Sequence, residues 1–316
     1  MTVVAAAPVS SLTGLRGRFE HGASLARHTT WRCGGPAGRL YFPADRDDLA
    51  ALLRQLPLDE PLTVLGLGSN VLVRDGGIPG TVVILHACLG ELALRDGLVY
   101  AQAGVPSPKV ARFAALHDLG DAEFLAGIPG TLGGALAMNA GCYGDETWRH
   151  VTRVEVLTRG GQFEQRHPAD YVIGYRSVRR ADRQADGAIF TAAWLSFPPG
   201  SSANARERIK ALLARRVATQ PLGLPNAGSV FRNPEGDHAA RLIESCGLKG
   251  YAIGGARVSE QHANFIVNPG GEARAADIEA IIDHVRAVVR GATGVDLQPE
   301  VRVIGEAAQA GREAQR

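Results

Sequence analysis

The sequence has few cysteines, no long hydrophobic run and almost no net charge, and each shortage excludes a class of protein. Its four cysteines are far apart in 316 residues and form no CxxC or Cys/His spacing, which argues against a zinc site and predicts reduced thiols. No stretch reaches the roughly 18 consecutive apolar residues of a membrane-spanning helix. We therefore expect a protein that binds no metal and does not insert into a membrane.

Charge of one sign is also missing. The 34 Lys and Arg residues are interleaved with 32 Asp and Glu residues, so the net charge is only +2. Without a massed basic field, nucleic acid is not an expected partner. The first residues, MTVVAAAPVSSLTGL, lack the positively charged start of a targeting peptide. We expect tails over 1–20 and 307–316, a cytoplasmic location and no obligate protein partner.

Glycine, with 39 residues, is present in excess, and strand and helix patterns alternate between the tails. Helices are predicted after Asp45 as N-cap, and from Ser107 as N-cap to Gly120. Strands dominate residues 151–197, and PPGSSAN at 198–204 is the clearest linker. Beyond it, helices are predicted over 203–218, 238–247 and 275–291, the last with Ile278, Ile281, Ile282, Val285, Val288 and Val289 inward.

These patterns predict an α+β protein. A glycine-rich N-terminal part would cover 21–198, in two lobes of about 21–85 and 86–198. A smaller α/β domain would cover 199–306.

Two glycine-rich loops stand out, LGLGSN at 65–70 and GIPGTLGGALAMNAG at 127–141. The first resembles the start of GxGxxG, but Val71 replaces the third glycine and VLV follows where a helix belongs. No GxxxxGK[ST] motif exists either. Backbone N–H groups of two tight turns could instead bind a pyrophosphate. The simpler alternative is two sharp turns in which glycine supplies positive φ. A hydroxyl and an amide in each loop favour a ligand: Ser69 and Asn70, Thr131 and Asn139.

These loops resemble the FAD-binding half of flavoenzymes related to vanillyl-alcohol oxidase and p-cresol methylhydroxylase (the VAO/PCMH type). Three further motifs, YRSV at 175–178, NAGSVFRNP at 226–234 and LQPEVRVIGE at 297–306, resemble one family within that group. It is the UDP-N-acetylenolpyruvoylglucosamine reductase (MurB) family of bacterial peptidoglycan synthesis. The resemblance runs from about residue 27 to residue 306.

The resemblance implies a flavoenzyme reaction. NADPH would reduce FAD, and the reduced flavin would convert UDP-N-acetylglucosamine enolpyruvate to UDP-N-acetylmuramate. Because the first glycine loop contains no histidine, we expect the FAD to be non-covalent. The implied FAD-binding residues are Gly66, Leu67, Gly68, Ser69, Asn70, Gly127, Ile128, Pro129, Gly130, Thr131, Gly133, Gly134, Asn139 and Gly141.

The resemblance also implies three catalytic residues. Hydride addition pushes charge into the substrate carboxylate, so the site needs a fixed cation, a group near that charge and a proton donor. Arg176, Glu300 and Ser229 stand at the family positions for these roles. Taken singly, each has a simpler interpretation: a surface arginine in an ion pair, a carboxylate at a strand end and a turn hydroxyl.

Substrate contacts are implied for Tyr175 and Asn233 near the UDP portion and for Arg216 at a phosphate. Arg215 is one residue away and could exchange roles with Arg216, or the pair could be a solvated helix end. His262 could line the site or be an ordinary packed or solvent-facing histidine.

No room exists between 238–250 and 254–265 for the tyrosine-bearing insertion of some family members, so the shorter type is expected. The alternatives are another flavin oxidoreductase of this fold, acting on a different acid or alcohol, and a nucleotide-binding module without catalysis.

Overall fold

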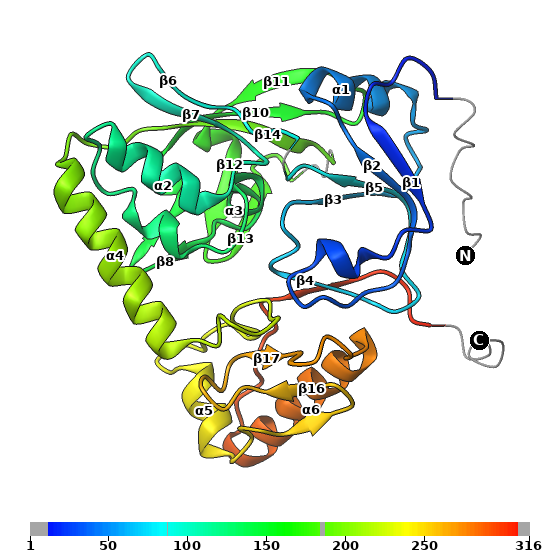
Figure 1. Cartoon of the computed structure of the whole chain (residues 1–316), viewed down its shortest axis with the longest axis vertical. Helices are drawn as coiled ribbons and strands as arrows, with labels where there is room; N and C mark the ends of the chain where they lie inside the picture. The colour runs from blue at the N-terminus through cyan, green and yellow to red at the C-terminus, as the bar shows by residue number, and fades with distance from the viewer. Residues whose placement is uncertain (1–11, 87, 184–186, 309–316) are drawn as a thin grey trace. The chain divides into compact units, whose positions relative to one another are not determined.

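The computed structural model describes residues 12–86, 88–183 and 187–308, and the chain forms two units (Figure 1). The first unit comprises 1–20, 40–67 and 81–216, and the second comprises 21–39, 68–80 and 217–316. The sequence analysis separated the two domains near residue 198 and divided the first into lobes near residue 85. In the structure, two N-terminal segments belong with the C-terminal part, and most of the helix after the predicted linker belongs with the first unit.

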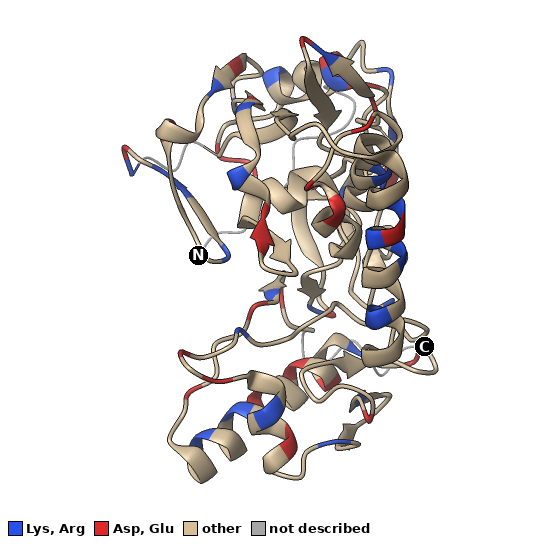
Figure 2. Cartoon of the chain, turned by 90° about the vertical axis from the view of Figure 1, so that its left-hand side faces the viewer, with Lys and Arg blue, Asp and Glu red and all other residues tan. Residues whose placement is uncertain are grey.

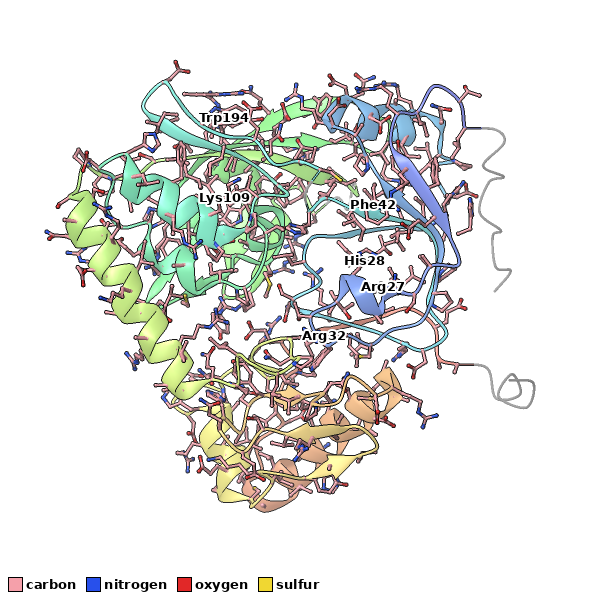
Figure 3. All side chains as sticks on the ribbon, in the orientation of Figure 1. Arg27, His28, Arg32, Phe42, Lys109 and Trp194 are labelled. Carbon is pink, nitrogen blue, oxygen red and sulfur yellow. The ribbon has the colours of Figure 1, made fainter. Side chains whose placement is uncertain are left out.

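A five-stranded antiparallel sheet forms the centre of the first unit. Its order is β11 (Phe163–Arg166), β10 (Val151–Leu157), β14 (Ile189–Leu195), β7 (Leu98–Gln102) and β6 (Leu92–Arg95). The central strand β14 is apolar on both faces because both are covered. Ala193 and Leu195 lie in the main core, whereas Trp194 packs on Tyr100 at a ring distance of 4.9 Å (Figure 3).

A second sheet has the order β1 (Arg18–His21), β2 (Ala37–Phe42), β5 (Ile78–Ile84) and β3 (Leu62–Leu65), with β3 parallel to β5. Strands β1, β2 and β5 contain residues of both units. Residues 12–20, predicted as part of a tail, are structured here, because Leu12, Leu15 and Phe19 pack against the cluster around Tyr41. The remaining tail residues, 1–11 and 309–316, lie outside the described residues.

The helices of the first unit are α1 (Arg46–Gln55), α2 (Ser107–Leu116), α3 (Leu132–Met138) and α4 (Ser202–Thr219). The predicted cap of α1 is confirmed, since Asp45 accepts a hydrogen bond from the Asp48 N–H. The prediction for α2 was wrong by one residue at its start. Pro106 is its N-cap, and the Ser107 N–H donates to Gly130 O in the second glycine loop instead of following a serine cap. The helix also ends at Leu116, short of Gly120.

The short elements of the first unit surround the second glycine loop. They are the 3-10 helices η3 (Glu123–Gly127), η4 (Thr147–Arg149) and η5 (Pro168–Asp170), the pair β8 (Gly141–Cys142) and β9 (Asp145–Glu146), and the hairpin β12 (Tyr171–Gly174) and β13 (Ser177–Arg180). This hairpin lies within the strand-rich region 151–197, and the YRSV motif begins in its turn and continues into β13.

The second unit packs α5 (Ala239–Ser245) and α6 (Ala275–Thr293) with the sheet β15 (Ala252–Ile253), β16 (Ala256–Val258) and β17 (Ile266–Val267). The pair β4 (Val71–Val73) and β18 (Arg302–Ile304) is parallel, and η2 covers Leu25–His28. Of the predicted inward face of α6, Val288 is only partly buried and the other five residues are buried. The fully buried Trp31 donates to Ile266 O at 2.7 Å, which explains why 21–39 belongs to this unit.

Charge is mixed on the described elements of the chain (Figure 2), although the charged residues of α4 are all basic except Glu207. None of the described helices is long and apolar enough to cross a membrane. Among the same residues, no group of three or more His, Cys, Asp or Glu side chains is arranged to hold a metal ion.

Candidate active site

A cavity of about 720 Å³ opens in the first unit between the two sheets and the second glycine loop. One part of its lining is glycine-rich backbone and the other is mainly apolar. The lining residues are Leu58, Glu60, Leu62, Val64, Gly66, Leu85, Thr131, Gly133, Gly134, Ala137, Arg159, Gly187, Ala188, Ile189 and Phe190. The structure thus brings both glycine loops to one cavity, as expected for two turns that grip one ligand.

The two loops touch where Gly66 meets Thr131, since a Cβ at Gly66 would collide with the threonine hydroxyl. Thr131 also caps α3 by accepting from the Gly134 N–H at 3.5 Å. Gly133 has a role in the fold, because its N–H donates to Ala103 O at 2.9 Å and an added Cβ would lie 2.8 Å from the Ala103 Cβ. Its N–H is therefore already engaged within the protein.

Gly134 is different from its neighbour. The nearest atom to a Cβ built on it is the Thr131 Oγ1 at 3.8 Å, which is ordinary contact, and the residue lines the cavity. Its missing side chain therefore leaves space that a ligand can fill.

Several other predicted FAD-binding residues do not line this cavity. A Cβ at Gly127 would meet the Cys142 Sγ, and one at Gly141 would meet Asp145 O, so glycine is required there by protein packing. Ile128 lies in the core. The Asn139 side chain, 1% exposed, donates to Glu146 and Gly174 O and accepts from the Trp148 N–H. Leu67, Pro129 and Gly130 are also outside the lining.

The second half of the first glycine loop, 68–70, belongs to the second unit. Gly68 has φ +60° and packs against the backbone of His28, which Figure 3 labels on η2. Its carbonyl accepts from the Thr30 N–H at 3.2 Å. The Asn70 side chain donates to Glu300 O at 3.2 Å, so this loop lies beside the LQPE motif. Ser69, between Gly68 and Asn70, is half-buried.

Arg176 lies in the turn of the β12–β13 hairpin with φ +53°, a conformation that is uncommon for any residue but glycine. Its guanidinium donates to Gly141 O at 2.9 Å and to Asn139 O at 3.3 Å, and its Cζ lies 4.9 Å from the centre of the Tyr175 ring. Asn139 is also left-handed, with φ +47°. The YRSV turn is therefore fixed directly onto the end of the second glycine loop.

Arg216 approaches the same loop from α4. The pKa of the Cys142 thiol is raised by burial to about 11, and both Arg216 and Arg176 oppose this rise, so the two guanidinium groups lie near one thiol. Burial lowers the pKa of Arg216, and the nearby Tyr143 and Cys142 oppose this decrease. Arg215 is exposed whereas Arg216 is half-buried, so only Arg216 of the pair turns part of its side chain away from solvent.

Ser229 and Glu300 lie on adjacent segments of the second unit. The Glu300 N–H donates to Val230 O at 2.7 Å, and Val230 follows Ser229 directly. On the other side of the serine, the Gly228 N–H donates to the Asn226 side chain at 2.9 Å. Both predicted catalytic residues of this unit are half-buried and held by fixed backbone.

Asn233 and His262 have structural contacts in the same unit. The Asn233 Oδ1 accepts from the Ala239 N–H at the start of α5, which is a capping role. His262 Nδ1 accepts from the Asn264 N–H at 3.2 Å, so its ring proton lies on Nε2. Burial lowers the pKa of His262, and a neutral imidazole at pH 7 follows. Residues 246–251 alone link α5 to β15, without an insertion.

Sequence reasoning missed two polar groups of the cavity, Glu60 and Arg159. Glu60 is 3% exposed and accepts from the Thr81 hydroxyl. Arg159 is held by loop carbonyls and has a buried Nη1 with no hydrogen-bond partner in the described part of the chain. Each stands at a turn beside a strand, where charged residues are common, so no sequence signal distinguishes them.

Comparison with known proteins decides between the alternatives. Residues 37–165 match the FAD binding domain model, and residues 220–304 match that of the UDP-N-acetylenolpyruvoylglucosamine reductase C-terminal domain. The reductase of Nitrosospira multiformis is 55% identical over 94% of this chain and 91% of its own length, and that of Thiobacillus denitrificans is 55% identical over 92% and 94%. The chain belongs to the UDP-N-acetylenolpyruvoylglucosamine reductase family.

A solved structure of this family has a similar fold. The crystal structure of UDP-N-acetylenolpyruvylglucosamine reductase (MurB) from Thermus caldophilus has a TM-score of 0.77, with 31% identity over 92% of this chain and 99% of that one. The α+β prediction is confirmed, with a PCMH-type FAD-binding part and a family-specific C-terminal domain. The open cradle at Gly134 and the unpartnered Arg159 Nη1 in an apolar cavity fit part of an FAD molecule.

Proposed function

We propose that Arg176, Ser229 and Glu300 carry out the reduction for which this family is named. The protein is an FAD-dependent oxidoreductase that converts UDP-N-acetylglucosamine enolpyruvate to UDP-N-acetylmuramate in peptidoglycan synthesis, with NADPH as co-substrate. Bound FAD supplies the chemistry of accepting a hydride from NADPH and giving it to the enolpyruvyl double bond. The observation that carries the assignment is the pairing of Ser229 and Glu300 on backbone segments joined by the Glu300 N–H.

Arg176 provides a permanent positive charge for the substrate carboxylate. Its hydrogen bonds to the carbonyl oxygens of Asn139 and Gly141 orient the guanidinium, which keeps its charge at any working pH. An arginine fixed in this way can bind a carboxylate through two parallel hydrogen bonds. The charge that develops on that carboxylate during the reaction is thereby stabilised.

Ser229 donates the proton that the alpha carbon of the substrate must take. Hydrogen bonds of its neighbours Gly228 and Val230 fix the backbone on both sides of Ser229. The position of its Cβ, which carries the hydroxyl, is therefore defined. Glu300, on the adjacent backbone segment, acts near the charge that develops on the substrate carboxylate. Positioned proton donors of this kind are typical of enolate chemistry.

The remaining predicted residues bind the substrate. Arg216 supplies a cation for a phosphate. Tyr175, which is 49% exposed, supplies an aromatic ring. His262 supplies a neutral Nε2–H donor. Asn233 caps α5 with its oxygen, so its amide N–H groups would make the contact. We further propose that the protein acts in the cytoplasm, where NADPH and reduced thiols occur together, and without an obligate protein partner.

Steady-state turnover tests this function. NADPH oxidation should require the enolpyruvyl UDP-sugar and should form UDP-N-acetylmuramate in equal amount, as measured by cofactor absorbance and mass spectrometry. A substrate-free reaction is the control. NADPH oxidation that does not depend on the UDP-sugar, or that leaves it unchanged, would contradict the assignment.

The flavin should be released from the chain by denaturation. The first glycine loop, GLGSNVLV, has no histidine through which the flavin could be attached. After acid precipitation, we expect FAD in the supernatant and none in the pellet, measured by absorbance and chromatography. Flavin that remains with the precipitated polypeptide would show a covalent link at another residue.

A further inference from the structure

The cavity of the first unit has a glycine end and a far end, and Arg159 lies at the far end. Leu62, Val64 and Gly66 are alternate residues along and just after β3, and all three line the cavity. Alternate residues of a strand point to one face, and a rise of about 3.3 Å per residue puts Leu62 about 13 Å from Gly66. Glu60, two residues before Leu62, is the residue whose carbonyl holds Arg159.

The guanidinium of Arg159 is held in a fixed orientation. Its Nη2 donates to three main-chain carbonyls, Pro57 O at 3.2 Å, Leu58 O at 3.4 Å and Glu60 O at 2.9 Å. Gly187 packs on the stem, since a Cβ there would lie 3.1 Å from the Arg159 Cγ. The side chain is thus clamped between two loops, and its position does not depend on a ligand.

The second terminal nitrogen of Arg159 has no partner. Nη1 is buried and makes no hydrogen bond within the described part of the chain, although the residue lines the cavity. Burial lowers the pKa of Arg159, and the nearby Glu60 opposes this. A buried donor left without an acceptor is costly, so a fixed one is expected to meet an acceptor on the ligand that fills the cavity.

The position of Arg159 selects the part of FAD that supplies this acceptor. The glycine loops are expected to hold the pyrophosphate, whereas the Arg159 guanidinium is held at the Glu60 carbonyl, beyond Leu62, which itself lies about 13 Å along the strand from Gly66. Apart from Glu60, the residues that line this end beside Arg159 are apolar, namely Leu58, Leu62, Ala188 and Phe190, which suits a flat heteroaromatic base. Arg176 is not part of this lining, so the flavin ring is expected elsewhere.

Building on the proposed function, we propose that Arg159 binds the adenine base of FAD by donating from Nη1 to one of its ring nitrogens. Arg159 is then a cofactor-binding residue that anchors the end of FAD farthest from the reaction. It would set how tightly FAD is held, and it would take no part in hydride or proton transfer.

Equilibrium binding to the full-length chain stripped of flavin tests this, with flavin fluorescence as the readout. The probes are FAD and three analogues in which adenine N1, N3 or N7 is replaced by C–H. One analogue should bind the unaltered protein about 10- to 100-fold more weakly than FAD does, the range for a hydrogen bond to a charged group. Arg159→Met should bind FAD more weakly by a similar factor. The analogue that bound weakly to the unaltered protein should bind this variant as tightly as FAD does.

Arg54→Met is the matched control, because Arg54 is a nearby arginine that donates to Gly161 O and does not line the cavity. It should leave all four affinities unchanged. If Arg159→Met does not fold, Arg159→Lys replaces it. The proposal would be overturned if all three analogues bound the unaltered protein as tightly as FAD. It would also be overturned if one analogue lost the same affinity relative to FAD in the unaltered protein and in Arg159→Met. A chain that binds no FAD at all would instead contradict the proposed function.

Discussion

Replacing Ser229 with alanine should slow reoxidation of the reduced enzyme by the enolpyruvyl substrate on the order of 100-fold to 10,000-fold, the usual loss for one positioned proton donor. Reduction of the enzyme by NADPH needs no proton donor to the substrate and should be nearly unchanged. Substrate affinity should also change little, because the UDP contacts remain. Rapid-mixing absorbance at the flavin band measures both half-reactions on one sample.

Two further variants give this prediction its controls. Ser245→Ala removes a hydroxyl from α5 that donates to Leu242 O, and it should leave both half-reactions unchanged. Ser229→Cys keeps a proton donor at the position and should recover part of the lost rate. Equal slowing of both half-reactions in Ser229→Ala would indicate a role in the fold. Unchanged reoxidation would move the proton donor elsewhere, with Glu300 the next candidate.

Alanine at Gly134 should weaken FAD binding without weakening the fold. Outside its own helix backbone, a methyl group at Gly134 meets the Thr131 hydroxyl at 3.8 Å as its nearest described neighbour, and it lies at the cavity. Overlap with a bound ligand commonly costs about 1–3 kcal/mol, so FAD affinity should fall by about 5- to 150-fold. The flavin-free protein should be unchanged or up to about 1 kcal/mol more stable, because alanine favours a helix over glycine.

Gly133→Ala is the matched comparison, one residue away. Its methyl group would lie 2.8 Å from the Ala103 Cβ, so it should lower the free energy of unfolding even without FAD. Flavin titration and urea unfolding of both variants measure the two effects separately. If Gly134→Ala binds FAD as tightly as the unaltered protein, the ligand does not lie over Gly134.

The parts of the fold that depend on local patterns were predictable from sequence. The Asp45 cap and the inward isoleucines of α6 follow from spacing alone, and both are present. The start of α2 was missed because the Ser107 N–H is taken by Gly130, a contact between distant residues. The place of 21–39 in the second unit was missed for the same reason, since it depends on Trp31 packing far along the chain.

In the site too, local patterns were predictable from sequence and contacts between distant residues were not. Glycine density identified the two loops, and motif order identified the family, but neither could separate Gly133 from Gly134, which differ only in what a side chain would meet. Arg159 and Glu60 have no sequence signal, because only the folded chain brings their turns to the cavity. The roles of Arg176, Ser229 and Glu300 remain predictions.

The central claim is that this chain passes reducing equivalents from NADPH through FAD to the enolpyruvyl UDP-sugar. The most direct test is anaerobic: the purified protein is reduced with NADPH, freed of nicotinamide and mixed with UDP-N-acetylglucosamine enolpyruvate. We predict that the absorbance of oxidised flavin returns at once and that about one UDP-N-acetylmuramate forms for each FAD. A flavin that stays reduced until oxygen is admitted, with the UDP-sugar unchanged, would contradict the claim.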